Sequence, residues 1–107
     1  MSDVAIARLN GVLSITLARP HKKNALTATM YEAMIAGLDE AERDETIAAA
    51  LIRGSGGVFT AGNDIADFLA AAQEGAADMA AFRFIQRIAS YGKPIIAAIE
   101  GPAIGLP

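Results

Sequence analysis

The sequence predicts an α/β fold in a single domain. Two short runs near the start alternate apolar and polar residues as strands do, and two later runs are continuously apolar as buried strands are. Two longer segments between these runs repeat apolar residues every three to four positions, as helices do. Alternation of strands and helices along 107 residues is typical of one α/β domain.

Composition limits the classes of protein and ligand. Hydrophobic residues make up 53% of the chain and charged residues 20%, which fits a globular protein rather than a disordered one. The net charge of -3 provides no basic surface for nucleic acid, and no apolar stretch approaches the ~20 residues needed to cross a membrane. Without cysteine, disulfides and thiolate metal sites are excluded, and we expect a cytoplasmic protein.

Residues 4–9 and 12–17 are the first two predicted strands. They are joined by Asn10-Gly11, the strongest short signal for a hairpin, because both central residues of a type I′ turn need a positive φ. Arg19-Pro20 ends the second strand, since proline has no N–H for the strand ladder. A polar loop, 21–26, follows.

The pattern predicts a helix over about 27–43. Thr27 or Thr29 can cap its start, and Thr29 with Glu32 has the spacing of a capping box. The apolar face of this helix carries Met30, Met34, Leu38 and Ala41. Gly37, in the middle of the predicted helix, indicates close packing at that point.

The second half repeats the alternation of strand and helix. Residues 47–52 read as a strand buried on both faces, and residues 95–99 as another. A short helix is expected from near Asp64, and a longer one over 78–91, with Gly92 as its C-terminal stop. One stripe of the longer helix carries Met79, Phe82, Ile85 and Ala89.

Three segments together resemble one protein family. Residues 19–26 read R-P-H-K-K-N-A-L and resemble the R-P-x-x-x-N-A-L loop of the crotonase (enoyl-CoA hydratase/isomerase) superfamily. Residues 59–65 read F-T-A-G-N-D-I and resemble its F-[ST]-A-G-x-D-[IL] segment. Residues 93–105 read K-P-I-I-A-A-I-E-G-P-A-I-G and resemble its K-P-x-I-A-A-[IV]-x-G-x-A-x-G segment. Each motif alone is weak, but their shared order implies the N-terminal turns of a crotonase-like ββα spiral.

The resemblance implies an oxyanion hole made of two backbone N–H groups, those of Asn63 and Leu106. Reactions at the α or β carbon of a thioester place negative charge on the carbonyl oxygen, and each such donor lowers the barrier by roughly 3–4 kcal/mol. Taken alone, the A-G-N-D segment would more often be a helix start, with Gly62 turning the chain and Asp64 capping. A helix start and an oxyanion hole are compatible here, because Asp64 can cap the helix while Asn63 presents its N–H.

For the first loop the resemblance implies binding of coenzyme A, as part of an acyl-CoA thioester substrate. Lys22 and Lys23 would meet the phosphates, and Ala25 and Leu26 would line the path of the pantetheine and adenine. Without the motif this loop would read as a solvated turn. The second motif adds further expected contacts with the substrate: Ala61, Asp64 and Ile65. No separate cofactor and no metal is implied.

The family's hydratases activate water with two glutamates that follow the glycine-rich turn, which here ends at Gly105. We therefore expect residues 1–107 to be one truncated domain, and whether the chain alone is an enzyme stays open. Residues 101–105 read G-P-A-I-G, a form that slightly favours the isomerase branch of the family.

Two functions are compatible with the resemblance. One is acyl-CoA hydration or double-bond isomerisation by the parent protein, with this fragment inactive. The other is a non-catalytic fragment that binds acyl-CoA or pairs with another chain. At full length the resemblance implies a trimer-based homo-oligomer.

Overall fold

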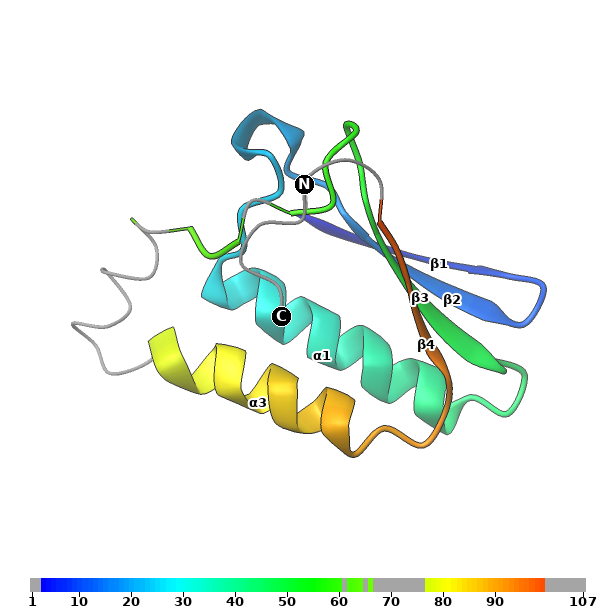
Figure 1. Cartoon of the computed structure of the whole chain (residues 1–107). Helices are drawn as coiled ribbons and strands as arrows, with labels where there is room; N and C mark the ends of the chain where they lie inside the picture. Colours follow the sequence, from blue (N-terminus) through cyan, green and yellow to red (C-terminus); the bar gives the residue numbers. More distant parts are fainter. Residues whose placement is uncertain (1–2, 61, 65, 67–76, 100–107) are drawn as a thin grey trace.

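The structure, a computed structural model, describes residues 3–60, 62–64, 66 and 77–99. Its described elements form two layers, a four-stranded sheet of order β1-β2-β3-β4 and two helices, α1 and α3, on one face of that sheet (Figure 1). The predicted α/β class is confirmed. Neither described helix is long and apolar enough to cross a membrane.

The N-terminal hairpin agrees with its prediction. Strand β1 (Val4–Leu9) pairs antiparallel with β2 (Val12–Leu17). Asn10 and Gly11 form the turn with φ of 51° and 80°, as a type I′ turn requires. The hairpin places β2 in the sheet interior with Leu13, Ile15 and Leu17 in the core.

Helix α1 (Ala28–Arg43) packs its predicted apolar face on the sheet. The cap is Thr27, whose hydroxyl accepts from the Met30 N–H at 3.1 Å. Thr29 lies inside the helix, so the capping box predicted for Thr29 and Glu32 is wrong. Gly37 marks close packing as expected, because a Cβ there would lie 2.9 Å from the Ile6 Cδ1 atom.

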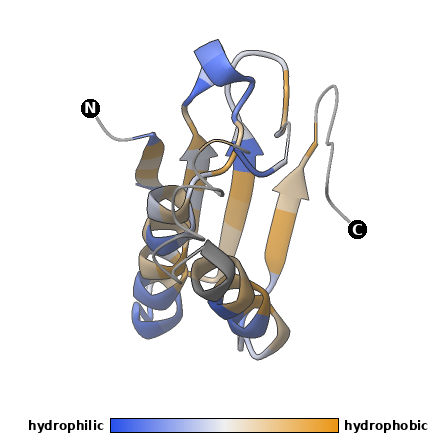
Figure 2. Ribbon diagram, turned by 90° about the vertical axis from the view of Figure 1, so that its left-hand side faces the viewer, coloured by the Kyte–Doolittle hydropathy of each residue, from blue (hydrophilic) through white to orange (hydrophobic). Residues whose placement is uncertain are grey.

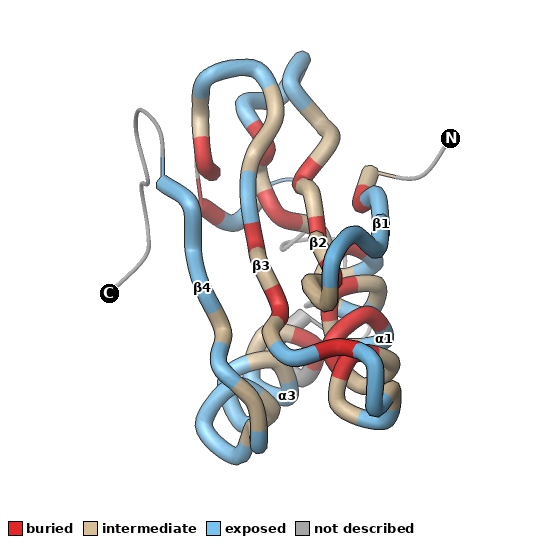
Figure 3. Tube along the Cα trace, turned by 90° about the vertical axis from the view of Figure 1, so that its right-hand side faces the viewer, coloured by how far each residue is buried: buried red, intermediate tan, exposed pale blue. Residues whose placement is uncertain are grey.

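Strands β3 (Ala49–Gly54) and β4 (Ile95–Ala98) extend the sheet in parallel with β2. The prediction that both are buried on two faces is wrong. Side chains of β3 alternate between buried and partly exposed, and β4 is exposed along most of its length because β3 is its only neighbour in the described sheet (Figure 3). The helices cover one face only, so the apolar runs are half covered.

Helix α3 (Ala77–Ala89) lies beside α1 and turns Ala80 and Phe84 inward. Phe82 and Ile85 of the predicted stripe do not face the core, being 60% and 63% exposed, and the side chain of Met79 lies outside the described part. The helix ends before Gly92, whose N–H instead donates to Glu42 Oε2 at 2.7 Å, so Gly92 is not the C-terminal stop.

Candidate functional site

Two motif loops meet at one end of the sheet. Strands β2, β3 and β4 are parallel, so their carboxyl ends share an edge, which is where α/β sheets commonly bind ligands. Residues 19–26 follow β2 and residues 55–64 follow β3. The hydrophilic 3-10 turn η1 (Pro20–Lys22) stands at this end, beyond the hydrophobic strands (Figure 2). The third motif begins just before β4 and continues past its end.

A short parallel bridge between Leu26 and Asn63 joins the two loops. The Leu26 N–H donates to the Gly62 carbonyl at 2.7 Å, and the Asp64 N–H donates to the Leu26 carbonyl at 2.8 Å. Because a parallel bridge uses the residues on either side of Asn63, the N–H of Asn63 points away from Leu26. Within the described part of the chain it donates no hydrogen bond, and Asn63 itself is exposed.

Gly62 makes this geometry possible. Its φ of +88° is a conformation that side chains with a Cβ rarely adopt, so the turn before Asn63 favours glycine. The Gly62 N–H donates to the Thr60 hydroxyl at 3.1 Å, and this hydroxyl donates to the Asn24 carbonyl at 2.7 Å. Thr60 is fully buried, and it ties the turn to the first loop.

Asn24 is the structural centre of the first loop. It is fully buried at a φ of 57°, and its side-chain nitrogen donates to the carbonyls of Ser55 and Val58, both at 2.8 Å. Its side-chain oxygen accepts from the Arg19 N–H at 2.8 Å. The asparagine of the R-P-x-x-x-N-A-L motif therefore holds the loop onto the turn after β3.

Arg19 and Asp64 form an ion pair across the two loops. Arg19 Nη1 lies 2.6 Å from Asp64 Oδ2 and donates to the Ala25 carbonyl at 3.1 Å. The two side chains are 15% and 14% exposed. The Asp64 carboxylate accepts a hydrogen bond from Arg19. Its predicted contact with the substrate stays a prediction. Arg19 was not among the predicted site residues.

The predicted coenzyme A contacts differ in exposure. Lys22 and Lys23 are exposed, with Lys23 in the left-handed region at a φ of 51°. Ala25 is half-buried, and Leu26 is 6% exposed within the core. The two lysines are open to solvent, while Leu26 packs in the core. Their contacts with coenzyme A stay a prediction.

Tyr31 is a site neighbour that the sequence did not reveal. Its hydroxyl donates to Asn63 Oδ1 at 2.5 Å, and its ring lies 5.4 Å from that of Phe84. Burial raises the pKa of the Tyr31 hydroxyl above its ordinary value, so the group is a neutral donor at physiological pH. The sequence feature that could have identified Tyr31 was its position in the first turn of the helix that follows the first motif loop.

An open groove lies between the helices and the sheet beside this site. It has a volume of about 360 Å³ and an apolar lining that includes Leu26, Met34, Phe59, Phe84, Ile88 and Ile99. No cluster of three or more histidine, cysteine or acidic side chains suited to a metal occurs in the described part. Ala61, Ile65 and Leu106 lie outside the described residues, so the predicted convergence of the Asn63 and Leu106 amides is untested.

A family model described as enoyl-CoA hydratase/isomerase matches residues 7–106. The chain belongs to this family. The predicted membership of the crotonase superfamily is confirmed, and so is the expectation of N-terminal turns of a crotonase fold, because the chain aligns with part of much longer structures of that fold.

Relatives named as an isomerase and as a hydratase have the same sequence identity to this chain. The chain is 33% identical to rat Enoyl-CoA delta isomerase 2, over 96% of this chain and 27% of that one. It is 33% identical to 2,3-dehydroadipyl-CoA hydratase of Escherichia coli K12, over 98% of this chain and 41% of that one. Similarity alone therefore does not separate hydratase from isomerase.

Solved structures give the same family. The structure of Pseudomonas aeruginosa OdaA has a TM-score of 0.87 and 39% identity, covering 98% of this chain and 42% of that one. An enoyl-CoA hydratase/isomerase from Xanthobacter autotrophicus Py2 has a TM-score of 0.85 and 34% identity, covering 94% of this chain and 39% of that one. The chain thus spans less than half the length of the relatives it matches.

Proposed function

We propose that this chain provides the first half of an acyl-CoA site that hydrates or isomerises a double bond through a thioester enolate. The Asn63 N–H carries the proposal: it lies on an exposed turn at the carboxyl end of the parallel strands and has no acceptor among the described residues. A thioester oxygen at this N–H would accept its hydrogen bond, and the N–H of Leu106 would be the second donor. Such fixed donors stabilise an oxyanion without reorganisation.

In this proposal the first loop holds the coenzyme A portion. Lys22 and Lys23 attract the phosphates, and the bridge from Leu26 to Asn63 sets the spacing between the nucleotide and the thioester. Coenzyme A enters with the substrate, and no metal is needed for this chemistry. The resemblance puts the general acid and base beyond Gly105, so we expect the 107 residues alone to bind acyl-CoA without turnover.

Asn63→Pro tests this proposal directly, because proline removes the N–H. Asn63 is not among the described residues with positive φ, and glycine before it tolerates a following proline. We expect about 2- to 10-fold weaker binding of butyryl-CoA, the effect of one hydrogen bond, with unchanged binding of free coenzyme A. Isothermal titration of the whole chain measures both ligands.

The control is Asn63→Ala, which keeps the N–H and should retain most of the thioester affinity. Equal loss in both variants would assign the effect to the side chain instead. Absence of any heat from butyryl-CoA at millimolar concentration in the unaltered chain would overturn the proposed function.

A second candidate function, pairing with another polypeptide, is favoured by the groove between the sheet and the helices. Ile88 and Ile99 line it and are 39% and 56% exposed. The occupant that fits is the remainder of an enoyl-CoA hydratase/isomerase domain, since this chain spans only 42% of the P. aeruginosa structure. Apolar segments of that remainder would cover the groove.

Mixing the chain with the remaining part of the P. aeruginosa relative, expressed separately, tests this pairing by size-exclusion chromatography. We expect a 1:1 complex that Ile88→Asp prevents and that Leu9→Asp, an exposed change on β1 at 72% exposure, leaves intact. Separate elution of the two unaltered polypeptides would exclude the pairing.

A further inference from the structure

The Arg19–Asp64 ion pair encloses the bridge that orients the Asn63 amide. Arg19 Nη1 contacts the carbonyl of Ala25, one residue before Leu26, at 3.1 Å. The same nitrogen contacts the carboxylate of Asp64, one residue after Asn63, at 2.6 Å. A single guanidinium group therefore holds both strands of the two-residue bridge from one side.

The burial of this pair makes it more than a surface contact. Both side chains are about one-seventh exposed, at 15% and 14%. In such a site the charges are poorly screened, and loss of one partner removes an opposite charge at hydrogen-bond distance from the other. Exposed ion pairs elsewhere in the chain differ: the side chains of Arg8 and Glu40 are 46% and 41% exposed. An interaction of this kind fixes geometry where an exposed pair would not.

The Arg19 side chain also lies near the N-terminal segment, with Nε 3.9 Å from Asp3 Oδ2. The backbone of Arg19 is anchored to the coenzyme A loop. Its backbone N–H donates to Asn24 Oδ1 at 2.8 Å, and its carbonyl accepts from the N–H groups of Lys22 and Asn24 at 3.0 and 2.9 Å. The residue that grips Asp64 is thus also the start of the turn that presents the lysines. Displacement of this turn would be transmitted to Asp64 through the guanidinium.

We propose that Arg19 and Asp64 are a positioning pair that aligns the Asn63 N–H and links it to the turn bearing Lys22 and Lys23. The inference rests on the proposed function for the role of that N–H, but the alignment is a property of the ligand-free chain. In this role neither side chain needs to touch the thioester. Their effect is on the direction of a neighbouring donor.

Asp64→Asn and Arg19→Lys test the pair in the whole chain. Asparagine removes the charge at nearly constant shape. Lysine keeps the charge on a side chain one atom shorter, so its ammonium group does not reach Ala25 and Asp64 in the same geometry. Asp39→Asn is the control for loss of a carboxylate elsewhere, because it removes a partner from Arg87 at 2.6 Å, in a more exposed ion pair that joins α1 to α3. Two-dimensional ¹⁵N NMR of the ligand-free chain reports the Asn63 and Leu26 amides.

We expect Asp64→Asn and Arg19→Lys to shift the Asn63 and Leu26 amide resonances and to speed hydrogen exchange of the Asp64 amide. Asp39→Asn should leave these signals in place. The ratio of butyryl-CoA affinity to free coenzyme A affinity should fall about 2- to 10-fold in the first two variants only, the effect of one misaligned hydrogen bond. A general loss of stability would not change that ratio.

Unchanged Asn63 and Leu26 signals in a folded Asp64→Asn variant would overturn the positioning role, and Arg19→Lys decides the question if Asp64→Asn does not fold. Shifted amides with an unchanged affinity ratio would also overturn it. If the unaltered chain binds neither ligand, the proposed function fails, while the Asn63 amide shift of ligand-free Arg19→Lys, a change distant in sequence, still decides whether the pair aligns Asn63.

Discussion

At the scale of single residues, Asn24 stabilises the fold through its side-chain hydrogen bonds, although it lies in a polar loop. It supplies two side-chain donors and one acceptor in a fully buried position, and asparagine tolerates its φ of 57° better than most residues. Replacement by a residue without the amide would leave the Ser55 and Val58 carbonyls without their donor. The motif asparagine is thus explained by hydrogen bonding within the protein and not by contact with a ligand.

Asn24→Ala should therefore lower the free energy of unfolding by about 2–4 kcal/mol, from lost hydrogen bonds and unsatisfied carbonyls. Urea denaturation followed by circular dichroism measures the change. Lys22→Ala, two residues earlier and exposed, is the control and should stay within about 0.5 kcal/mol of the unaltered chain. Similar losses in both variants would contradict the assigned role of Asn24.

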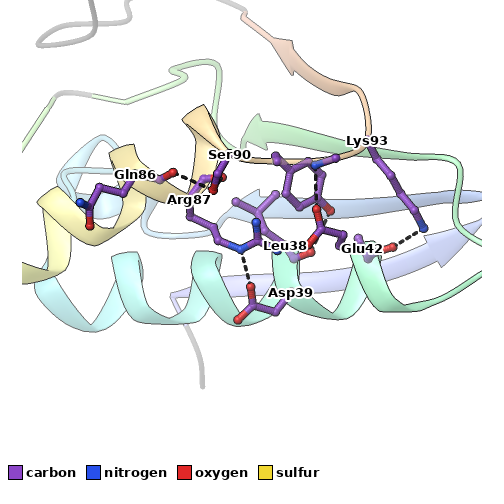
Figure 4. Close-up of polar contacts among 10 residues, drawn as sticks. Leu38, Asp39, Glu42, Gln86, Arg87, Ser90 and Lys93 are labelled. Atoms are coloured by element: carbon purple, nitrogen blue, oxygen red, sulfur yellow. Dashed lines mark hydrogen bonds and ion pairs between the residues drawn. The ribbon is translucent and has the colours of Figure 1, made fainter.

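At the scale of elements, polar contacts add to the apolar packing where α3 and β4 meet α1. Lys93 Nζ donates to the carbonyls of Ala41, Asp44 and Ile47 at 2.6 to 2.8 Å, which satisfies the end of α1 and the turn after it. Figure 4 shows Lys93 beside the end of α1, and Arg87 pointing to Asp39. Arg87 of α3 binds Asp39 and Glu42 of α1. The lysine of the third motif thus places the start of β4 against α1.

The stability of this contact depends on pH through Glu42. The hydrogen bond from Arg87, and then that from the Gly92 N–H, hold the pKa of Glu42 below its ordinary value, with smaller help from the charges of Arg87 and Lys93. A lowered pKa in the folded state stabilises the fold above the ordinary glutamate pKa of about 4.3, and this contribution is lost as the pH falls through the folded value.

Between pH 6 and pH 3 we therefore expect the unaltered chain to lose more thermal stability than Glu42→Gln does. Melting temperatures at half-unit pH steps measure the difference. Asp44, whose pKa is also lowered, first by the Thr46 hydroxyl, is present in both proteins, so the difference between them isolates Glu42. Parallel pH curves would contradict this coupling.

At the scale of the whole molecule, the sequence predicted the elements that depend on local signals. The Asn10-Gly11 hairpin, the α1 stripe and the α/β class follow from turn chemistry and periodicity. The faces of β3, β4 and α3 were predicted less well, because an apolar run does not reveal whether another layer covers it. The Arg19–Asp64 pair spans 45 residues, a separation at which periodicity and turn signals carry no information.

The half-covered faces lead to a prediction for the molecule as a whole. Ile88 and Ile99 line the groove between α3 and β4, where an apolar dye of the size of anilinonaphthalene sulfonate finds apolar side chains on several sides. We expect the folded chain to enhance the fluorescence of this dye, and Ile88→Ser to reduce the enhancement by removing part of the lining. Leu9→Ser removes a side chain that is more exposed, at 72%, but lies on β1 and not among the groove residues. Leu9→Ser should leave the dye fluorescence unchanged, because an exposed side chain outside the groove does not enclose the dye. Equal losses of fluorescence in the two variants would mean that the dye reports general exposure rather than this groove.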